Sequence, residues 1–353
     1  MRQDRLVTSR APRKGVSPWS VLVGGLGVLL AGVALRRRTA PPVPVGLDVP
    51  APFRASALAR RLDPYREVPS GDPIPPPLPR GEIVDVPGRG EMFVRRADGP
   101  AGATPVLLLH GWMASADLNF FALYDDLAQR HPILAPDHRG HGRGIRDARR
   151  FTLEACADDA AALLGHLGIP KVVAVGYSMG GPIAMLFAAR HPDLLSGLVL
   201  EATGLEWSGT RRERFIWRLM WLVGVMLRWD ASRILLVRLN GGAPQVPDEM
   251  LRYRGWLEGE FRRGDPSDLA QAGRALGRFD GRMLAARIGV PVAVVITTKD
   301  ELVLPSKQRE LATLLDARIF EFPGDHLSAG VQGRDFAAVT LRAIAAVSPN
   351  ADA

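Results

Sequence analysis

The sequence predicts an α/β protein in which a mainly parallel sheet is covered by helices on both faces. From Gly81 onward, short runs of Val, Ile and Leu alternate with longer stretches of helical pattern. One apolar run leads directly into a glycine-flanked serine and then into a helical stretch. From 205 to 288 the alternation stops, and helical sequence rich in arginine and tryptophan fills the interval. These observations indicate one α/β core, 81–204 with 289–353, and an inserted helical cap over the sheet's carboxyl edge.

The N-terminal segment, 1–38, is expected to be a basic stretch followed by a transmembrane anchor. No residue from Gly15 to Leu35 is charged, and Val21 to Leu35 contains only Val, Leu, Ala and Gly. At 1.5 Å per helical residue this run reaches about 30 Å, the thickness of the hydrocarbon core. A cleaved signal peptide is the alternative, but Arg36 to Arg38 stand where cleavage needs small residues. We therefore expect a single-pass membrane protein. Basic residues flank both ends of the run, so the side of the catalytic core stays open.

A proline-rich linker, 39–80, is expected between the anchor and the core. Prolines cluster at both of its ends, which is typical of a semi-rigid extended spacer. Ala55 to Leu62 has the pattern of a short basic amphipathic helix. Such a helix either lies against lipid headgroups or is an ordinary solvated linker helix.

The core is predicted to begin with an antiparallel pair of strands around Pro87-Gly88, followed by strands that alternate with helices. The expected strands are Ile83–Val86, Met92–Arg95, Val106–Leu109, Ile133–Ala135, Val172–Val175, Leu198–Leu200, Val292–Ile296 and Ile319–Phe322. The expected helices are Ala116–Arg130, Thr152–Leu167, Gly181–Arg190, Ser306–Leu315 and Asp335–Val347.

The predicted cap, 205–288, contains five of the seven tryptophans of the chain: Trp207, Trp217, Trp221, Trp229 and Trp256. Phe215 to Leu227 is apolar on nearly every side and is bounded by arginines. Interfacial helices combine such faces with arginines that reach phosphate groups. Lipid contact and plain packing on the sheet are both consistent with this pattern.

The composition excludes several classes of function. The net charge of +8 suggests an anionic neighbour, but the basic residues are scattered and form no nucleic-acid recognition module. We expect a membrane partner and no nucleic acid. Cys156 is the only cysteine, so no intrachain disulfide or cysteine cluster can form. No metal-protease, P-loop or dinucleotide motif is present, and we expect neither a metal nor a cofactor.

The strongest motif is Gly176-Tyr177-Ser178-Met179-Gly180, which joins the strand Val172–Val175 to a helix. A side chain on such a tight strand-to-helix turn is held in a strained geometry and directed into the crevice, and small flanking residues provide the clearance. The following helix also points its free N–H groups at the site. The pattern predicts Ser178 as a nucleophile.

A serine hydroxyl needs a base within hydrogen-bonding reach and a third group that orients the base. His326 follows the strand Ile319–Phe322, and Asp300 follows the strand Val292–Ile296, both at carboxyl ends. We predict His326 as the general base and Asp300 as the orienting acid. Glu201 is the alternative acid, because it ends the strand beside the nucleophile strand.

The stretch from Gly81 to Val347 resembles the α/β-hydrolase superfamily, in the group of esterases and lipases with a helical cap. Four motifs carry the resemblance in order: His110-Gly111-Trp112, Asp137-His138-Arg139-Gly140-His141-Gly142, the nucleophile turn, and the Asp300 and His326 segments. The resemblance implies an oxyanion hole made by the backbone N–H groups of Trp112 and Met179. It also implies that His110 and His141 belong to structural turns and that Asp137 and Arg139 hydrogen-bond within their loop.

The expected function is hydrolysis of carboxylic esters, with apolar acyl substrates, through an acyl-enzyme on Ser178. Relatives that act on epoxides or carbon–halogen bonds carry aspartate at this position, which favours acyl transfer to water. The same residues would also support an acyltransferase or a hydrolase of carbon–carbon or amide bonds. A catalytically silent, membrane-anchored scaffold is the alternative from a different class.

Overall fold

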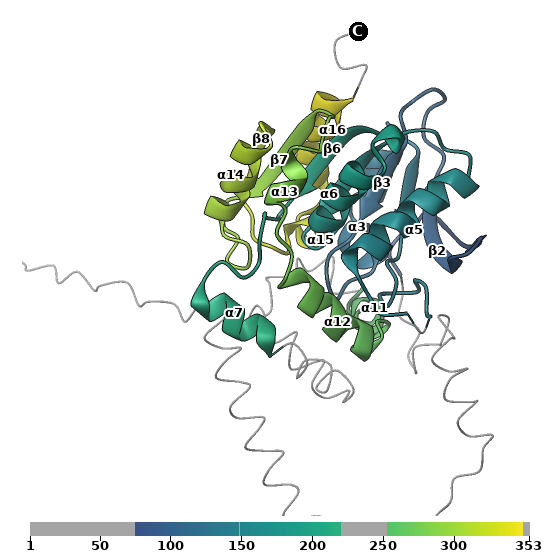
Figure 1. Ribbon diagram of the computed structural model, residues 1–353. Coiled ribbons are helices and arrows are strands. Elements are labelled where there is room, and N and C mark those ends of the chain that lie inside the picture. Colours follow the sequence, from purple (N-terminus) through teal and green to yellow (C-terminus); the bar gives the residue numbers. More distant parts are fainter. Residues whose placement is uncertain (1–74, 148, 220–252, 349–353) are drawn as a thin grey trace, which may run out of the picture.

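One eight-stranded sheet forms the centre of the protein (Figure 1). The computed structural model describes residues 75–147, 149–219 and 253–348. The strand order is β1-β2-β4-β3-β5-β6-β7-β8; β2 is antiparallel to both β1 and β4, and the other neighbours are parallel. The predicted, mainly parallel sheet is thus confirmed. Its strands are β1 (Arg80–Val86), β2 (Gly90–Ala97), β3 (Val106–Leu109), β4 (Ile133–Pro136), β5 (Val172–Tyr177), β6 (Leu195–Glu201), β7 (Val292–Thr297) and β8 (Arg318–Phe322).

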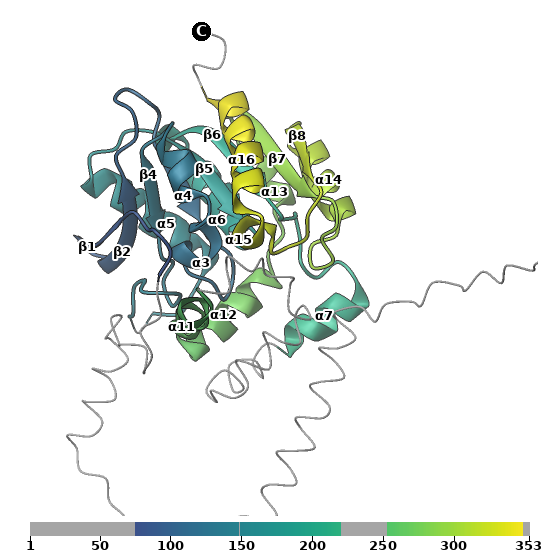
Figure 2. The same ribbon diagram turned by 180° about the vertical axis from the view of Figure 1, so that it is seen from behind.

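Helices cover both faces of the sheet, and Figure 2 shows α16 (Gly333–Val347) in front of the strands. One face packs against α5 (Leu153–His166), α6 (Gly180–Arg190) and α14 (Pro305–Leu314). The other packs against α16 and two short helices, α3 (Ala116–Phe120) and α4 (Tyr124–Ala128). A 3₁₀ turn, η1 (Pro192–Leu194), precedes β6, and α15 (Ser328–Val331) precedes α16.

The apolar runs are continuous because the central strands are buried on both faces. In β5, Val172 and Ala174 belong to the α5–α6 side, whereas Val173 and Val175 belong to the α16 side. All four side chains are fully buried. Parallel strands between two helical layers need apolar residues at every position, which is why the run shows no polar alternation.

The predicted helix from Ala116 to Arg130 is wrong as a single element. It is two helices, α3 and α4, separated by a turn at residues 121–123. The backbone of Gly333, at the start of α16, lies against this turn, and a Cβ on Gly333 would be only 2.1 Å from the Ala122 Cβ. Because this packing involves a segment more than two hundred residues away, the local helical pattern could not indicate the break.

Within the predicted cap interval, the described residues form α7 (Arg211–Arg218), α11 (Arg254–Arg262), α12 (Pro266–Leu276) and α13 (Arg282–Ala285). In Figures 1 and 2, α7, α11 and α12 lie beyond one end of the sheet strands. Trp207, Trp217 and Trp256 are buried, and Trp217 packs in the core cluster of the α5–α6 face. The side chains of these three tryptophans therefore pack inside the protein. Trp221 and Trp229 lie outside the described residues.

The predicted anchor and most of the linker also lie outside the described residues, because the description begins at residue 75. None of the helices in the described ranges combines the length and apolarity that a membrane crossing requires. At the predicted boundary between linker and core, β1 begins at Arg80, and Leu78 already packs against the core.

Candidate active site

The nucleophile turn lies between the end of β5 and the start of α6. Ser178 has a positive φ of 53°, which is strained for a residue with a side chain. Its backbone is held on both sides: Ser178 N–H donates to the Glu201 carbonyl at 2.9 Å, and Thr203 Oγ donates to the Ser178 carbonyl at 2.8 Å. A Cβ on Gly180 would lie 1.9 Å from the Leu109 carbonyl oxygen, so only glycine fits there.

Three predicted residues meet at the carboxyl edge of the sheet. His326 Nε2 lies 2.9 Å from Ser178 Oγ, and His326 Nδ1 lies 2.8 Å from Asp300 Oδ2. A carboxylate can only accept, so Nδ1 carries the imidazole proton and Nε2 presents its lone pair to the serine hydroxyl. The Asp300 side chain is fully buried, and that of His326 is 14% exposed. Solvent can therefore reach the histidine but not the acid.

The Asp300 carboxylate is fixed by four further donors. Oδ1 accepts the backbone N–H groups of Leu302 at 2.8 Å and Val303 at 2.9 Å. Oδ2 accepts from Thr297 Oγ at 2.9 Å and from Gln308 Nε2 at 3.3 Å. These contacts leave the carboxylate one orientation, with Oδ2 toward His326. Thr297 and Gln308 were not predicted as site residues, because no motif marks either of them.

The loop after β3 reaches the nucleophile as predicted for a candidate oxyanion hole. A Cβ on Gly111 would lie 3.2 Å from the Ser178 Cβ, so a larger residue would crowd the serine. Gly111 N–H donates to Asn119 Oδ1 at 2.7 Å, which holds the loop in this position. Trp112 follows at once, and Met179, fully buried, begins the turn into α6. The two residues of the predicted hole thus come from segments in contact.

The profile of the α/β hydrolase fold family matches residues 104–329, which is more than half of the chain and spans Ser178, Asp300 and His326. The chain belongs to this family. Its curated relatives include the pimeloyl-[acyl-carrier protein] methyl ester esterase of Chromobacterium violaceum. That protein is 33% identical over 225 residues, which cover 62% of this chain and 85% of the relative. An uncharacterized Mycobacterium tuberculosis protein is 34% identical over 145 residues, which cover 41% of this chain and 39% of the relative.

Solved α/β-hydrolase structures resemble the chain at lower identity. The enol-lactonase of Burkholderia xenovorans superposes with a TM-score of 0.62 at 23% identity, covering 74% of this chain and 99% of the enzyme. A membrane phospholipase A superposes with a TM-score of 0.64 at 20% identity, covering 92% of this chain and 98% of that protein. The protein is therefore an α/β hydrolase with esterase-type relatives.

In this hydrolase the alternative acid, Glu201, is buried away from His326. Its Oε1 accepts from Thr340 Oγ at 2.7 Å, and Oε2 has no hydrogen-bond partner among the described residues. Burial raises the pKa of Glu201 to about 7. The carboxyl that contacts His326 Nδ1 is that of Asp300.

We expect Glu201 to lower the stability of the hydrolase as the pH rises. The folded protein holds the Glu201 proton up to about pH 7, whereas the unfolded chain releases it near 4.5. Unfolding therefore releases a proton in this window, and the free energy of unfolding falls by on the order of 3 kcal/mol. Glu201→Gln removes this dependence. Urea unfolding of the wild type and of Glu201→Gln at pH 5 and pH 8 measures this effect. The difference between their free energies of unfolding should change between the two pH values. Glu154 is exposed, and Glu154→Gln is the control. If the difference in free energy of unfolding between wild type and Glu201→Gln were the same at both pH values, the prediction would be wrong.

Tyr177, which precedes the nucleophile, supports the histidine segment. Its hydroxyl donates to the His326 carbonyl at 2.7 Å, and its ring packs against the rings of His326 and Phe336. The motif predicted small residues flanking Ser178 but indicated no role for Tyr177. The structure shows that Tyr177 connects the nucleophile strand to the loop of the base.

His110 and His141, in the two glycine-rich turns, are buried, and their rings hydrogen-bond to backbone groups. His110 accepts from His138 N–H at 2.9 Å through Nε2, and its Nδ1 donates to the Gly111 carbonyl at 2.8 Å. Burial lowers the pKa of His110 to about 4 and that of His141 to about 3, so both are neutral at pH 7. The described residues contain no group of three His, Cys, Asp or Glu side chains that could hold a metal ion.

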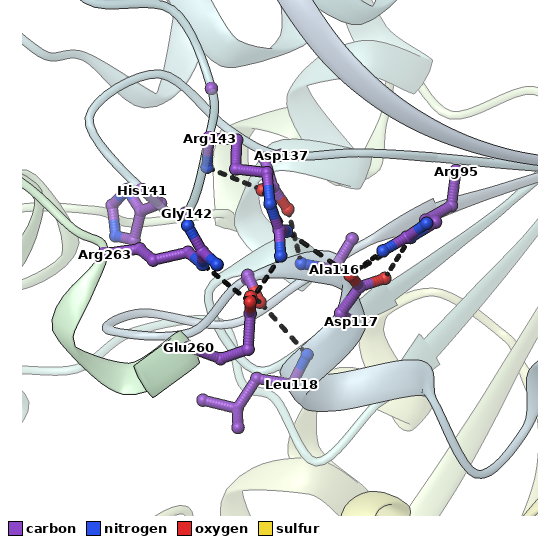
Figure 3. A network of polar contacts seen from close by, with 12 residues as sticks. Arg95, Ala116, Asp117, Leu118, Asp137, His141, Gly142, Arg143, Glu260 and Arg263 are labelled. Atoms are coloured by element: carbon purple, nitrogen blue, oxygen red, sulfur yellow. Dashed lines mark hydrogen bonds and ion pairs between the residues drawn. The ribbon is translucent and has the colours of Figure 1, made fainter. Parts of the chain in front are cut away.

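A buried ion network attaches α11 of the cap to the core (Figure 3). Glu260, on α11, pairs with Arg143 and accepts from Ser115 Oγ at 3.0 Å. Arg143 Nη1 lies 3.3 Å from Asp117 Oδ2. Asp137 accepts the N–H groups of Ala116 and Arg143, each at 2.7 Å. Removing one partner of a buried pair leaves an uncompensated charge at a cost of about 3–5 kcal/mol. Helix α11 of the cap is therefore held firmly beside the loop that contains Gly111.

Arg139, in the same turn, pairs with Asp159 of α5 through two bonds, of 2.7 and 2.8 Å. Both side chains are buried. Asp137 and Arg139 therefore act as loop ties, and neither is among the groups that contact Ser178 or His326.

Proposed function

We propose that the protein hydrolyses carboxylic esters of apolar acids, with Ser178 as nucleophile, His326 as base and Asp300 as the orienting acid. The observation that carries the proposal is the continuous hydrogen-bonded chain from Ser178 Oγ through His326 to Asp300. This chain lies at the carboxyl edge of the sheet, where open α/β sheets bind ligands. The esterase relatives support the reaction class.

The proposed reaction has two halves. His326 Nε2 takes the Ser178 proton as Oγ attacks the acyl carbonyl, and Asp300 stabilises the imidazolium that forms. The Trp112 and Met179 amides stabilise the oxyanion; losing one such donor typically costs about 10²- to 10³-fold in rate. The imidazolium then protonates the departing alcohol and leaves an acyl-enzyme. In the second half, water gives a proton to His326 as it attacks the acyl carbon. His326 then passes this proton to Ser178 Oγ as the bond between Oγ and the acyl carbon breaks, which releases the acid and restores both residues.

A fluorophosphonate probe and an ester panel test this proposal. Labelling at Ser178, with turnover of p-nitrophenyl esters that increases with acyl length, would support it, because each buried methylene adds about 0.8 kcal/mol of transfer energy. A folded protein that neither labels nor turns over esters would instead be a silent scaffold. Mass spectrometry of the products with alcohol or amine acceptors present separates hydrolysis from acyl transfer. An acylated acceptor as the main product would identify an acyltransferase.

We also propose that residues 16–35 anchor the enzyme in a membrane, which rests on the uncharged run alone. The full chain is expected to sediment with membranes and to resist carbonate extraction. A chain starting at residue 75 is expected to stay in the supernatant and to keep ester turnover, because the described core begins there. Mass spectrometry of the native N-terminus is the check on cleavage. A mature end near Thr39 would contradict the anchor and establish a signal peptide.

A further inference from the structure

A hollow of about 330 Å³ opens in the cap beside α7 and the end of α12. Four arginines line it, Arg214, Arg218, Arg274 and Arg278, together with Trp217 and Gly277. Among the described residues that line it, none carries a carboxylate. The hollow therefore combines an aromatic wall with a high density of positive charge.

Three of these arginines have no carboxylate partner among the described residues. Arg218, Arg274 and Arg278 form no ion pair there, whereas Arg143, Arg263 and Arg282 do. Two acids stand close to these arginines in the sequence, and both have other partners: Asp280 pairs with Arg282 at 3.1 Å, and Glu213 pairs with Lys307 at 2.7 Å. The Arg214 side chain is held by the segment before α7, because its Nη1 donates to the Ser208 and Gly209 carbonyls. Like charges around one hollow repel each other, and a bound anion would relieve that repulsion.

We propose that this hollow binds the phosphodiester headgroup of a glycerophospholipid whose acyl ester is cleaved at Ser178. The assignment rests on the proposed function of Ser178. Guanidinium groups match phosphate oxygens in paired hydrogen bonds, which makes several arginines around one hollow a phosphate-binding arrangement.

Two tryptophans in contact with each other lie between the hollow and the loop beside the nucleophile. The rings of Trp217 and Trp112 lie 5.8 Å apart, centroid to centroid. Trp112 Nε1 donates to the Leu269 carbonyl at 2.7 Å, which fixes the ring against α12. The backbone of Gly111, next to Trp112, lies directly against Ser178. Trp112 thus contacts both the wall of the hollow and the segment beside Ser178, and the proposed substrate would span this residue, with its ester at Ser178 and its phosphate at the arginines.

The apolar surroundings favour a lipid over a free anion. Trp217 forms one wall of the hollow, and Phe215 on the same helix is 57% exposed. The volume falls in the range of about 300–1,000 Å³ that is common for small-molecule sites, which is larger than one phosphate ion needs. A headgroup with its glycerol fills such a space better than inorganic phosphate.

Two esters with the same acyl chain test the headgroup site in the full-length enzyme: a lysophosphatidylglycerol and the neutral monoacylglycerol. The variant is Arg274→Gln with Arg278→Gln. Its control is Arg211→Gln with Arg287→Gln, which removes two exposed charges from the same cap outside the hollow. We expect the ratio of the two kcat/KM values, phosphate ester over neutral ester, to fall about 10- to 100-fold in the variant. The control should keep the wild-type ratio.

Binding is measured separately in the Ser178→Ala protein, so that the site can be judged without turnover. Tryptophan fluorescence gives the Kd of a short-chain phosphatidylglycerol, and the double arginine variant is expected to raise it at least about tenfold. An unchanged Kd and an unchanged ratio would overturn the headgroup site, as would equal effects in the control. Binding of inorganic phosphate without binding of the lipid would assign the hollow to a free anion and also overturn it. Absence of turnover on both esters, with the Kd effect intact, would instead refute the proposed function of Ser178.

Discussion

Ser178→Ala is expected to abolish ester turnover and leave the fold intact. The change removes the hydroxyl that lies 2.9 Å from His326 Nε2. Loss of the nucleophile in a serine protease lowers kcat by on the order of 10⁶-fold, and we expect a comparable loss here. Steady-state hydrolysis of a p-nitrophenyl ester measures it. Alanine fits the same turn, because the strained φ of 53° is held by the bonds of Ser178 N–H and C=O to Glu201 and Thr203.

Ser196→Ala is the matched control for this variant. Ser196 lies on β6 and donates through Oγ to the Val172 carbonyl, at the opposite end of the sheet strands from Ser178. It should keep wild-type kcat and fluorophosphonate labelling. If Ser178→Ala retained more than a few per cent of wild-type kcat with an unchanged circular dichroism spectrum, covalent catalysis by this serine would be wrong.

Asp300→Asn is expected to lower kcat by up to about 10⁴-fold, as the equivalent change does in a serine protease. The reason lies in the backbone N–H groups of Leu302 and Val303, which both donate to Oδ1. An asparagine in this place keeps its oxygen toward those two donors and turns its NH₂ toward His326 Nδ1. Nδ1 must then accept, so the proton moves to Nε2 and the base loses the lone pair that Ser178 needs. The pH dependence of kcat and the rate of fluorophosphonate labelling measure this loss.

Glu201→Gln is the matched control, since it makes the same chemical change in the other candidate acid. Glu201 contacts Thr340, and its side chain makes no hydrogen bond to His326. We expect its kcat near pH 6 to stay within about twofold of wild type, because a neutral amide replaces a carboxyl whose pKa burial raises to about 7 and which is therefore largely protonated at that pH. If Glu201→Gln abolished turnover and Asp300→Asn did not, the acid assignment would be reversed.

Most of the fold could be predicted because its cause is local. The buried strands, such as Val172–Tyr177, are short apolar runs, and the longer core helices α5, α6, α14 and α16 follow patterns that can be seen in the residues alone. The break between α3 and α4 was not predicted; at this turn Ala122 packs against Gly333, a contact between segments that are far apart in the chain. The same holds for Trp217, whose apolar neighbourhood was compatible with lipid contact and with packing until the positions of Trp112 and Trp207 were known.

The sequence by itself determined the chemistry that this protein can carry: a serine between glycines at a strand end, an acid and a histidine after two later strands, and an uncharged N-terminal run. Only the tertiary structure decided which carboxyl faces His326: Asp300, in the loop after β7, contacts Nδ1, whereas Glu201, the last residue of β6, contacts Thr340. It also decided the roles of Gln308 and Tyr177 and the arginine-lined hollow of the cap. These contacts join residues that are distant in the chain or carry no motif, so their geometry exists only after the chain has folded.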